Sequence, residues 1–201
     1  MDQLFVELSG QYLSIIPVLL VIIALMSILI GTLRTGISPM PSSRKAHRQV
    51  VRLLRQSNAL TSSKRQLIDC GSGWGNLAFK LARHFPEDKI VGFELSRLPW
   101  LFSTLAARVM GLKNLYFIRA DFLKQDLSTA DILICYLHPE GMKKLNHKLT
   151  SVPSEYQQQL ISIYFALPHR TPEYQKQLTD LYRTPIYQYQ LGQPATSSNR
   201  D

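Results

Sequence analysis

The stretch Leu67-Ile68-Asp69-Cys70-Gly71-Ser72-Gly73-Trp74-Gly75-Asn76-Leu77 decides the fold of this 201-residue chain. Apolar residues lead into three alternating glycines, and a segment of helical pattern starts directly after them. Glycine permits a sharp turn and lets a ligand approach the backbone closely. In open α/β sheets, ligands bind at the carboxyl ends of the strands, where such a loop lies. The stretch therefore predicts a strand, a ligand-binding loop and a helix.

Strand and helix patterns alternate through the rest of the chain. Strands are expected over residues 66–70, 89–95, 115–120, 131–137, 160–167 and 185–191, and helices over 44–56, 76–84, 98–110 and 139–149. Strands that alternate with helices form parallel βαβ units. The expected fold class is therefore α/β, with a mainly parallel, Rossmann-like sheet over residues 65–192. The polar residues 193–201 are expected to be disordered.

Three acidic residues follow successive predicted strands and indicate the ligand. The loop reads G-x-G-x-G, whereas the dinucleotide fingerprint is G-x-G-x-x-G. S-adenosylmethionine has no phosphate, so Asp69 can serve its ammonium group, Glu94 its ribose hydroxyls and Asp121 its adenine amino group. Glu94 alone would also suit NAD. The expected cofactor is S-adenosylmethionine, bound by Asp69, Gly71, Ser72, Gly73, Gly75, Glu94 and Asp121.

These motifs resemble those of a known family. The pattern D-x-G-x-G-x-G, an acid ending the second strand and an acid after the third resemble class I S-adenosylmethionine-dependent methyltransferases over residues 65–137. The resemblance implies a Rossmann-like sheet and methyl transfer. No Cys/His cluster has the spacing of metal ligands, and Cys70 and Cys135 are expected to be buried, reduced thiols.

A long apolar segment precedes this domain. Residues 12–33 carry no charge, and a helix of this length spans about 30 Å of hydrocarbon. A cleaved signal peptide is disfavoured, because the segment follows acidic residues and no small-residue cleavage site comes after it. Residues 1–33 are therefore expected to be a retained, single-pass transmembrane anchor. Eight Lys and Arg residues and no acid lie in 34–65. By the positive-inside rule the catalytic domain is expected on the cytoplasmic side of an inner or plasma membrane, or on the matrix side if the membrane is mitochondrial.

Residues 34–64 form a basic linker followed by a helix that Ser43 caps. Val50, Val51, Leu53 and Leu54 are expected on its apolar face, and Arg44, Arg48, Arg52 and Arg55 on another. This basic face is either solvated or lies on anionic lipid headgroups. The excess of basic residues is also compatible with an RNA substrate, but no RNA-binding module is evident, so no specific nucleic acid is expected as a partner.

A closer resemblance covers most of the chain. The single anchor, the glycine loop, the segments FEL and RADFLK, and FALPHRTPEY near the end resemble the small membrane-anchored protein-lysine methyltransferases of mitochondria and their bacterial relatives. Known members methylate the ATP synthase c subunit and the adenine nucleotide translocase, so the resemblance implies a lysine of a membrane-associated protein as acceptor. A lipid-soluble small molecule and a non-catalytic role as an assembly factor remain as alternatives.

The predicted catalytic residues lie on the loop after the fourth strand. Tyr136, His138 and Glu140 are the candidates for positions around the transferred methyl group. His138 and Glu140 have an alternative structural role, since both stand where they can cap the following helix. The N-P-P-Y tetrad of methyltransferases that act on adenine or glutamine amino groups is absent, with Pro139 alone present.

Overall fold

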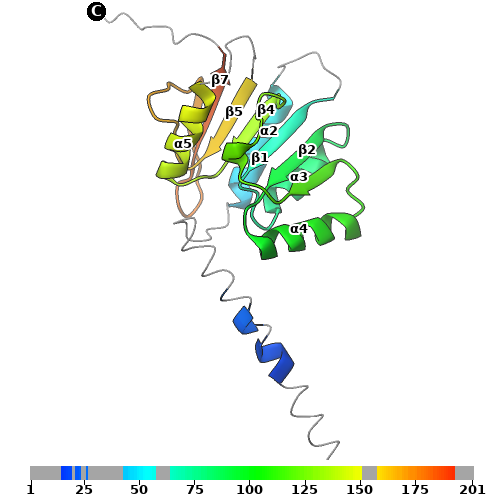
Figure 1. Ribbon diagram of the computed structural model, residues 1–201. Helices are drawn as coiled ribbons and strands as arrows, with labels where there is room; N and C mark the ends of the chain where they lie inside the picture. Colours follow the sequence, from blue (N-terminus) through cyan, green and yellow to red (C-terminus); the bar gives the residue numbers. More distant parts are fainter. Residues whose placement is uncertain are drawn as a thin grey trace, which may run out of the picture. The chain divides into compact units, whose positions relative to one another are not determined.

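The computed structural model describes residues 15–19, 21–23, 26, 43–57, 64–150 and 158–192 (Figure 1). The chain divides into two compact units, residues 1–40 and residues 41–201. The second unit contains the predicted glycine loop and all the strands described below.

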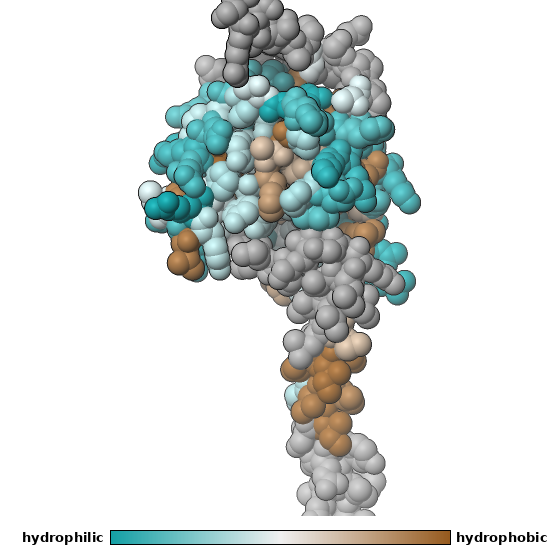
Figure 2. Space-filling model, turned by 90° about the vertical axis from the view of Figure 1, so that its left-hand side faces the viewer, coloured by the Kyte–Doolittle hydropathy of each residue, from teal (hydrophilic) through white to brown (hydrophobic). Residues whose placement is uncertain are grey.

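The first unit contains the predicted anchor. Its described residues, 15–19, 21–23 and 26, are helical, and their large apolar side chains are exposed. Figure 2 shows them as a hydrophobic group, in contrast to the mainly hydrophilic face of the second unit. Within the described residues, no helix is both long and apolar enough to span a membrane. Most of the segment predicted to do so, 12–33, lies outside those residues, as does the predicted disordered end, 193–201.

The second unit is built on a seven-stranded sheet in the order β3-β2-β1-β4-β5-β7-β6 (Figure 1). The strands are β1 (Gln66–Cys70), β2 (Lys89–Phe93), β3 (Leu115–Ile118), β4 (Ile132–Cys135), β5 (Gln158–Ile163), β6 (Tyr174–Gln177) and β7 (Pro185–Leu191). The first five are parallel, and β7 pairs antiparallel with both β5 and β6. The prediction of a mainly parallel α/β sheet is confirmed.

Helices cover both faces of this sheet (Figure 1). They are α2 (Arg44–Gln56), α3 (Asn76–His84), α4 (Arg97–Val109) and α5 (Pro139–Thr150), with a 3-10 turn, η1 (Phe122–Lys124). One apolar cluster joins α2, α3 and α4 to the sheet, and a second joins α5 to the opposite face. Their buried apolar side chains supply the main stabilisation of such a layered fold.

Helix α2 is part of this packed unit. The Ser43 hydroxyl accepts a hydrogen bond from the Ala46 backbone N–H at 3.1 Å, which satisfies one of the open donors at the helix start. The predicted apolar stripe is buried and the four predicted arginines are exposed. The predictions of the cap and of the two faces are therefore confirmed.

Four strands, β2, β3, β4 and β5, end two to four residues earlier than predicted, and one strand was missed. Strand β2 stops at Phe93, and β5 stops at Ile163 because Tyr164 has φ 77°, a left-handed conformation that ends an extended strand. Strand β6 escaped prediction because three of its four side chains are exposed and polar at the sheet edge. Strand prediction relies on buried, alternating apolar residues, which an edge strand of this kind lacks.

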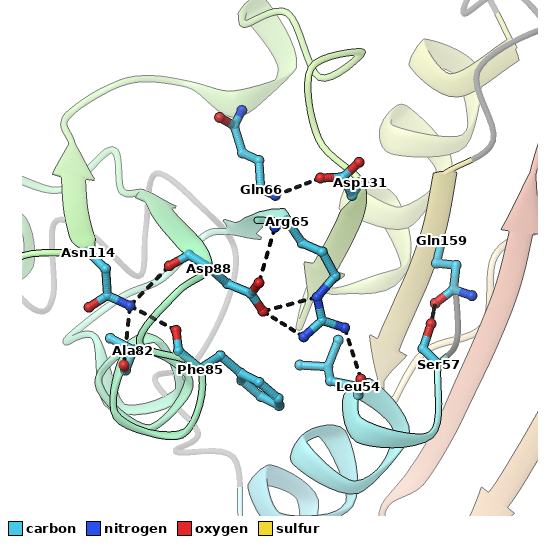
Figure 3. Close-up of polar contacts among 10 residues, drawn as sticks. All are labelled: Leu54, Ser57, Arg65, Gln66, Ala82, Phe85, Asp88, Asn114, Asp131 and Gln159. Carbon is cyan, nitrogen blue, oxygen red and sulfur yellow. Dashed lines mark hydrogen bonds and ion pairs between the residues drawn. The ribbon is translucent and has the colours of Figure 1, made fainter. Parts of the chain in front are cut away.

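A polar network fastens the amino ends of the strands, remote from the glycine loop (Figure 3). The guanidinium of Arg65 pairs with Asp88 at 2.6 Å and donates to the carbonyl of Leu54 at the end of α2. The amide of Asn114 donates to three backbone carbonyls, those of Ala82, Phe85 and Asp88. These bonds fix α2 and the starts of β1 and β2 relative to one another. They thereby form a rigid frame for the carboxyl edge of the sheet, where the glycine loop lies.

Candidate active site

The glycine loop between β1 and α3 is fastened to the end of β2. The backbone N–H groups of Gly71 and Ser72 both donate to the carbonyl of Phe93, at 3.1 and 2.8 Å. Gly73 and Gly75 have φ of 53° and 80°, where side chains other than glycine are strained. The loop therefore holds a turn at the carboxyl edge of the sheet that the three glycines make possible.

Glu94, which directly follows β2, closes this arrangement. Its carboxylate accepts hydrogen bonds from the backbone N–H of Gly73 at 2.9 Å and from that of Ser96 at 2.6 Å. It thereby links the glycine loop to the start of α4. Glu94 is 9% exposed.

Asp69, at the end of β1, is the most unusual ionisable group in the site. It is 5% exposed, and its carboxylate accepts no hydrogen bond within the described part of the chain. Burial, with a further contribution from the negative charge of Glu94, raises the pKa of Asp69 from 3.8 to about 7. A buried carboxylate without a partner is costly unless a cation or a hydrogen-bond donor compensates it. The geometry therefore fits a cationic ligand beside Asp69.

Asp121 follows β3 at the same edge of the sheet. Its carboxylate accepts a hydrogen bond from the backbone N–H of Leu123 at 3.0 Å and so caps η1. The side chain is half-buried. The structure thus places Asp121 at the edge that Asp69 and Glu94 occupy, and there it caps η1.

The space around the loop is uneven. A Cβ added to Gly73 would meet no atom within 4 Å, whereas one added to Gly75 would lie 2.8 Å from the ring of Phe117 and 2.9 Å from that of Phe79. Gly75 is therefore needed for packing between loop and sheet, and Gly73 borders open space. Ser72 is buried beneath the loop, and its hydroxyl lies 3.4 Å from the carbonyl of Phe93.

Three tyrosines come together beside the end of β4. The rings of Tyr136 and Tyr164 lie 6.3 Å apart between centroids. Burial raises the pKa of Tyr136, and the phenols of Tyr164 and Tyr182 raise it further. The sequence indicates Tyr136 alone, because Tyr164 falls inside the predicted strand 160–167 and Tyr182 lies 46 positions further along the chain. The aromatic residues in the segments after the fourth and fifth strands were the sequence feature that could have indicated further tyrosines in the site.

The other two predicted catalytic residues have structural contacts. Glu140 is exposed in the first turn of α5, where it pairs with Lys143 at 3.6 Å. The ring of His138 packs against Gly141, and its Nδ1 atom is buried without a hydrogen bond. His138 therefore lies at the base of the loop after β4, and Glu140 faces solvent.

The described residues contain no group of three His, Cys, Asp or Glu side chains able to hold a metal ion. Cys70 and Cys135 are free and buried on neighbouring strands, as expected. The site is thus formed by carboxylates, a glycine loop and tyrosines. It offers recognition of a cation and an orienting surface for a second reactant.

A profile of the ANTKMT methyltransferase domain matches residues 69–174, just over half of the chain. No curated protein matches the sequence significantly. Among solved structures, an RNA methyltransferase from Salinibacter ruber, in complex with S-adenosyl-L-homocysteine, is similar with a TM-score of 0.64 and 20% identity. That similarity covers 81% of this chain and 100% of the other.

Two further structures share the fold. A putative methyltransferase, yhhF, from Escherichia coli has a TM-score of 0.59 at 12% identity, covering 76% of this chain and 87% of that one. Magnesium protoporphyrin IX methyltransferase (ChlM) from Synechocystis PCC 6803, with bound S-adenosylmethionine, has a TM-score of 0.56 at 17% identity, covering 73% and 78%. These similarities establish the methyltransferase fold.

Proposed function

Because the chain belongs to the ANTKMT methyltransferase domain family, we propose that it methylates a lysine amine of a membrane-associated protein. The methyltransferase class and the cofactor S-adenosylmethionine follow from the family and the fold. The acceptor, the membrane anchor and the cytoplasmic location of the domain are the proposal.

The observation that carries the cofactor assignment is the pair of buried carboxylates beside the glycine loop. Asp69 has no hydrogen-bond donor of its own among the described residues, and Glu94 lies close enough to raise its pKa. S-adenosylmethionine bears an ammonium and a sulfonium group, so it would supply the positive charge that this pair lacks. Gly73 leaves room for a ligand against the backbone. The residues present therefore fit this cofactor.

The tyrosines at the end of β4 support an amine as the acceptor. The faces of aromatic rings attract ammonium groups and exclude water, and Tyr136 and Tyr164 come from two different loops at this edge. The raised pKa of Tyr136 keeps its hydroxyl protonated at neutral pH, so it can orient an amine through a hydrogen bond.

When bound, the cofactor supplies an electrophilic methyl group, and the protein must hold the nucleophile in line with it. A lysine amine has a reference pKa of about 10.4 and attacks only after losing its proton. Tyr136 is accordingly the candidate residue that orients the acceptor amine.

The apolar residues of the first unit support membrane attachment; those described, 15–19, 21–23 and 26, are helical. Their large side chains are exposed, and the adjoining chain is basic without any acid up to residue 65. Attachment would confine the enzyme to the membrane plane and raise its effective concentration for acceptors there. This is why we favour a membrane protein over a soluble one.

The test is to incubate the full chain with radiolabelled S-adenosylmethionine and membranes from a strain that lacks it. The proposal expects label in a protein band and, after hydrolysis, in methyllysine. Asp69→Asn, which should bind the cofactor roughly ten- to 150-fold more weakly, is the matched low-activity control at limiting cofactor. Label that extracts into organic solvent would instead establish a lipid-soluble small molecule as acceptor, and label in nucleic acid would establish an RNA substrate. Cofactor binding without any transfer would refute the enzymatic proposal and leave the role of assembly factor.

A further inference from the structure

The hairpin that joins β6 to β7 lies at the same edge of the sheet as the glycine loop. Strand β7 begins opposite the end of β5, since Ile186 pairs with Ile163, and β6 ends opposite Pro185. The connecting residues 178–184 therefore stand at the carboxyl end of β5. Tyr182 of this hairpin lies close enough to Tyr136 to raise the pKa of its hydroxyl.

The hairpin is internally braced, yet its tip is apolar and exposed. The Asp180 carboxylate accepts from the backbone N–H of Thr184 at 2.7 Å, and the Asp180 carbonyl accepts from that of Arg183 at 3.1 Å. Leu181 is 87% exposed and Tyr182 55% exposed. Leucine and tyrosine side chains that are exposed in this way bury little apolar surface, so they contribute little to the stability of the turn.

Helix α2 begins against this hairpin. The Ser43 hydroxyl donates to the carboxylate of Asp180, and the ammonium of Lys45 donates to the carbonyl of Thr179 at 2.6 Å. The start of α2 thus lies at the edge of the sheet that holds the site. The far end of α2 is bonded at the opposite edge through Leu54 and Arg65.

A basic groove of about 360 Å³ lies between α2 and β6. Four of its lining side chains are cationic and none is acidic. The lining residues are Lys45, Arg48, Gln49, Arg52, Lys176, Gln177, Leu178 and Thr179. The positive charge extends beyond the groove. The pKa of Lys80 is lowered by burial and by the charges of Arg44 and Arg48. Such a field attracts anions and is relieved when they bind.

We propose that the hairpin tip, residues 178–184, and the basic groove together form a docking surface for an anionic lipid bilayer. Leu181 and Tyr182 enter the headgroup region, where tyrosine is favoured, and the groove binds lipid phosphates. Each Lys or Arg near an anionic surface contributes about 1 kcal/mol. The surface turns the acceptor side of the site toward the membrane. This inference rests on the proposed membrane location and goes beyond it by fixing which edge of the domain meets the lipid.

The experiment uses the full chain, reconstituted in vesicles of phosphatidylcholine and phosphatidylglycerol. Leu181→Cys is labelled with the environment-sensitive dye NBD. The native thiols Cys70 and Cys135 are buried, and burial raises the pKa of both, so they resist labelling. Lys113→Cys, an exposed position at the opposite edge of the sheet, is the matched control.

Docking predicts blue-shifted emission and quenching by brominated lipid at position 181, with neither change at position 113. Adding Arg48→Glu and Lys176→Glu should lower the docked-to-free ratio at least thirty-fold, since about 2 kcal/mol is lost. Chains that float with the vesicles but show equal, unquenched emission at both positions would overturn the docking surface and leave the anchor standing. Chains that do not float would overturn both, and methyl transfer is assayed separately.

Discussion

Asp69→Asn tests the central physical argument, that an uncompensated buried carboxylate awaits a cationic ligand. The substitution keeps the shape of the side chain and removes its charge. In the wild-type protein without ligand, burial and Glu94 hold the pKa of Asp69 at about 7, against 3.8 in the ordinary carboxyl group. That difference corresponds to about 4 kcal/mol.

The sign of the effect on stability follows from linkage. The folded state holds the proton more tightly, so the wild-type protein loses stability as the pH rises from about 4 to 7, at up to about 1.4 kcal/mol per pH unit. Asp69→Asn has no ionisable carboxyl group at this position, so its stability should not fall in this way. The variant should therefore match the wild type near pH 4 and exceed it by up to about 4 kcal/mol above pH 7, as measured by denaturant unfolding without cofactor.

Cofactor binding should respond in the opposite sense. A charge-assisted bond lost in Asp69→Asn costs about 1.5–3 kcal/mol, or roughly ten- to 150-fold in Kd. Wild-type affinity for S-adenosylmethionine should also rise between about pH 5.5 and 7.5 as Asp69 ionises, whereas the variant's affinity should stay flat. Isothermal titration calorimetry measures both.

The matched control is Asp126→Asn. Asp126 is exposed and bonded to Ser128, so its replacement should leave cofactor affinity and its pH dependence unchanged. Equal affinity and equal pH dependence in the wild type and Asp69→Asn would refute the assignment of the cationic site. A stability difference that did not vary with pH would refute the raised pKa.

Three other substitutions have definite expected outcomes. Glu94→Gln removes the like charge beside Asp69, so the pKa of that group should fall and the pH dependence of cofactor affinity should move to lower pH; an unmoved titration would contradict the coupling. Gly75→Ala should cost roughly 2–5 kcal/mol in denaturant unfolding, because its Cβ meets two phenylalanine rings and its φ is left-handed; a cost below 1 kcal/mol would exclude that crowding. Asp88→Ala leaves the guanidinium of Arg65 buried without its carboxylate and should cost about 3–5 kcal/mol, and a neutral result would show that solvent reaches the pair.

The sequence alone predicted the strand, the glycine turn and the helix that follows it. An apolar run, three alternating glycines and a helical pattern lie within eleven consecutive residues, and the turn they encode is local. Glu94 and Asp121 were found because each follows a strand, and parallel strands bring their carboxyl ends to one edge. The cap at Ser43 and the two faces of α2 were likewise set by spacing along one helix.

The tertiary structure decided what depends on distant segments meeting. The pKa of Asp69 is set by burial, and Tyr164 and Tyr182 join Tyr136 through strand pairings that no local pattern reports. Strand β6 is short, polar and at the sheet edge, so its position, and with it the hairpin against α2, came only from the pairing with β7. The periodicity of apolar residues indicates which side of a helix or strand is buried. The register and order of the strands determine which loops become neighbours.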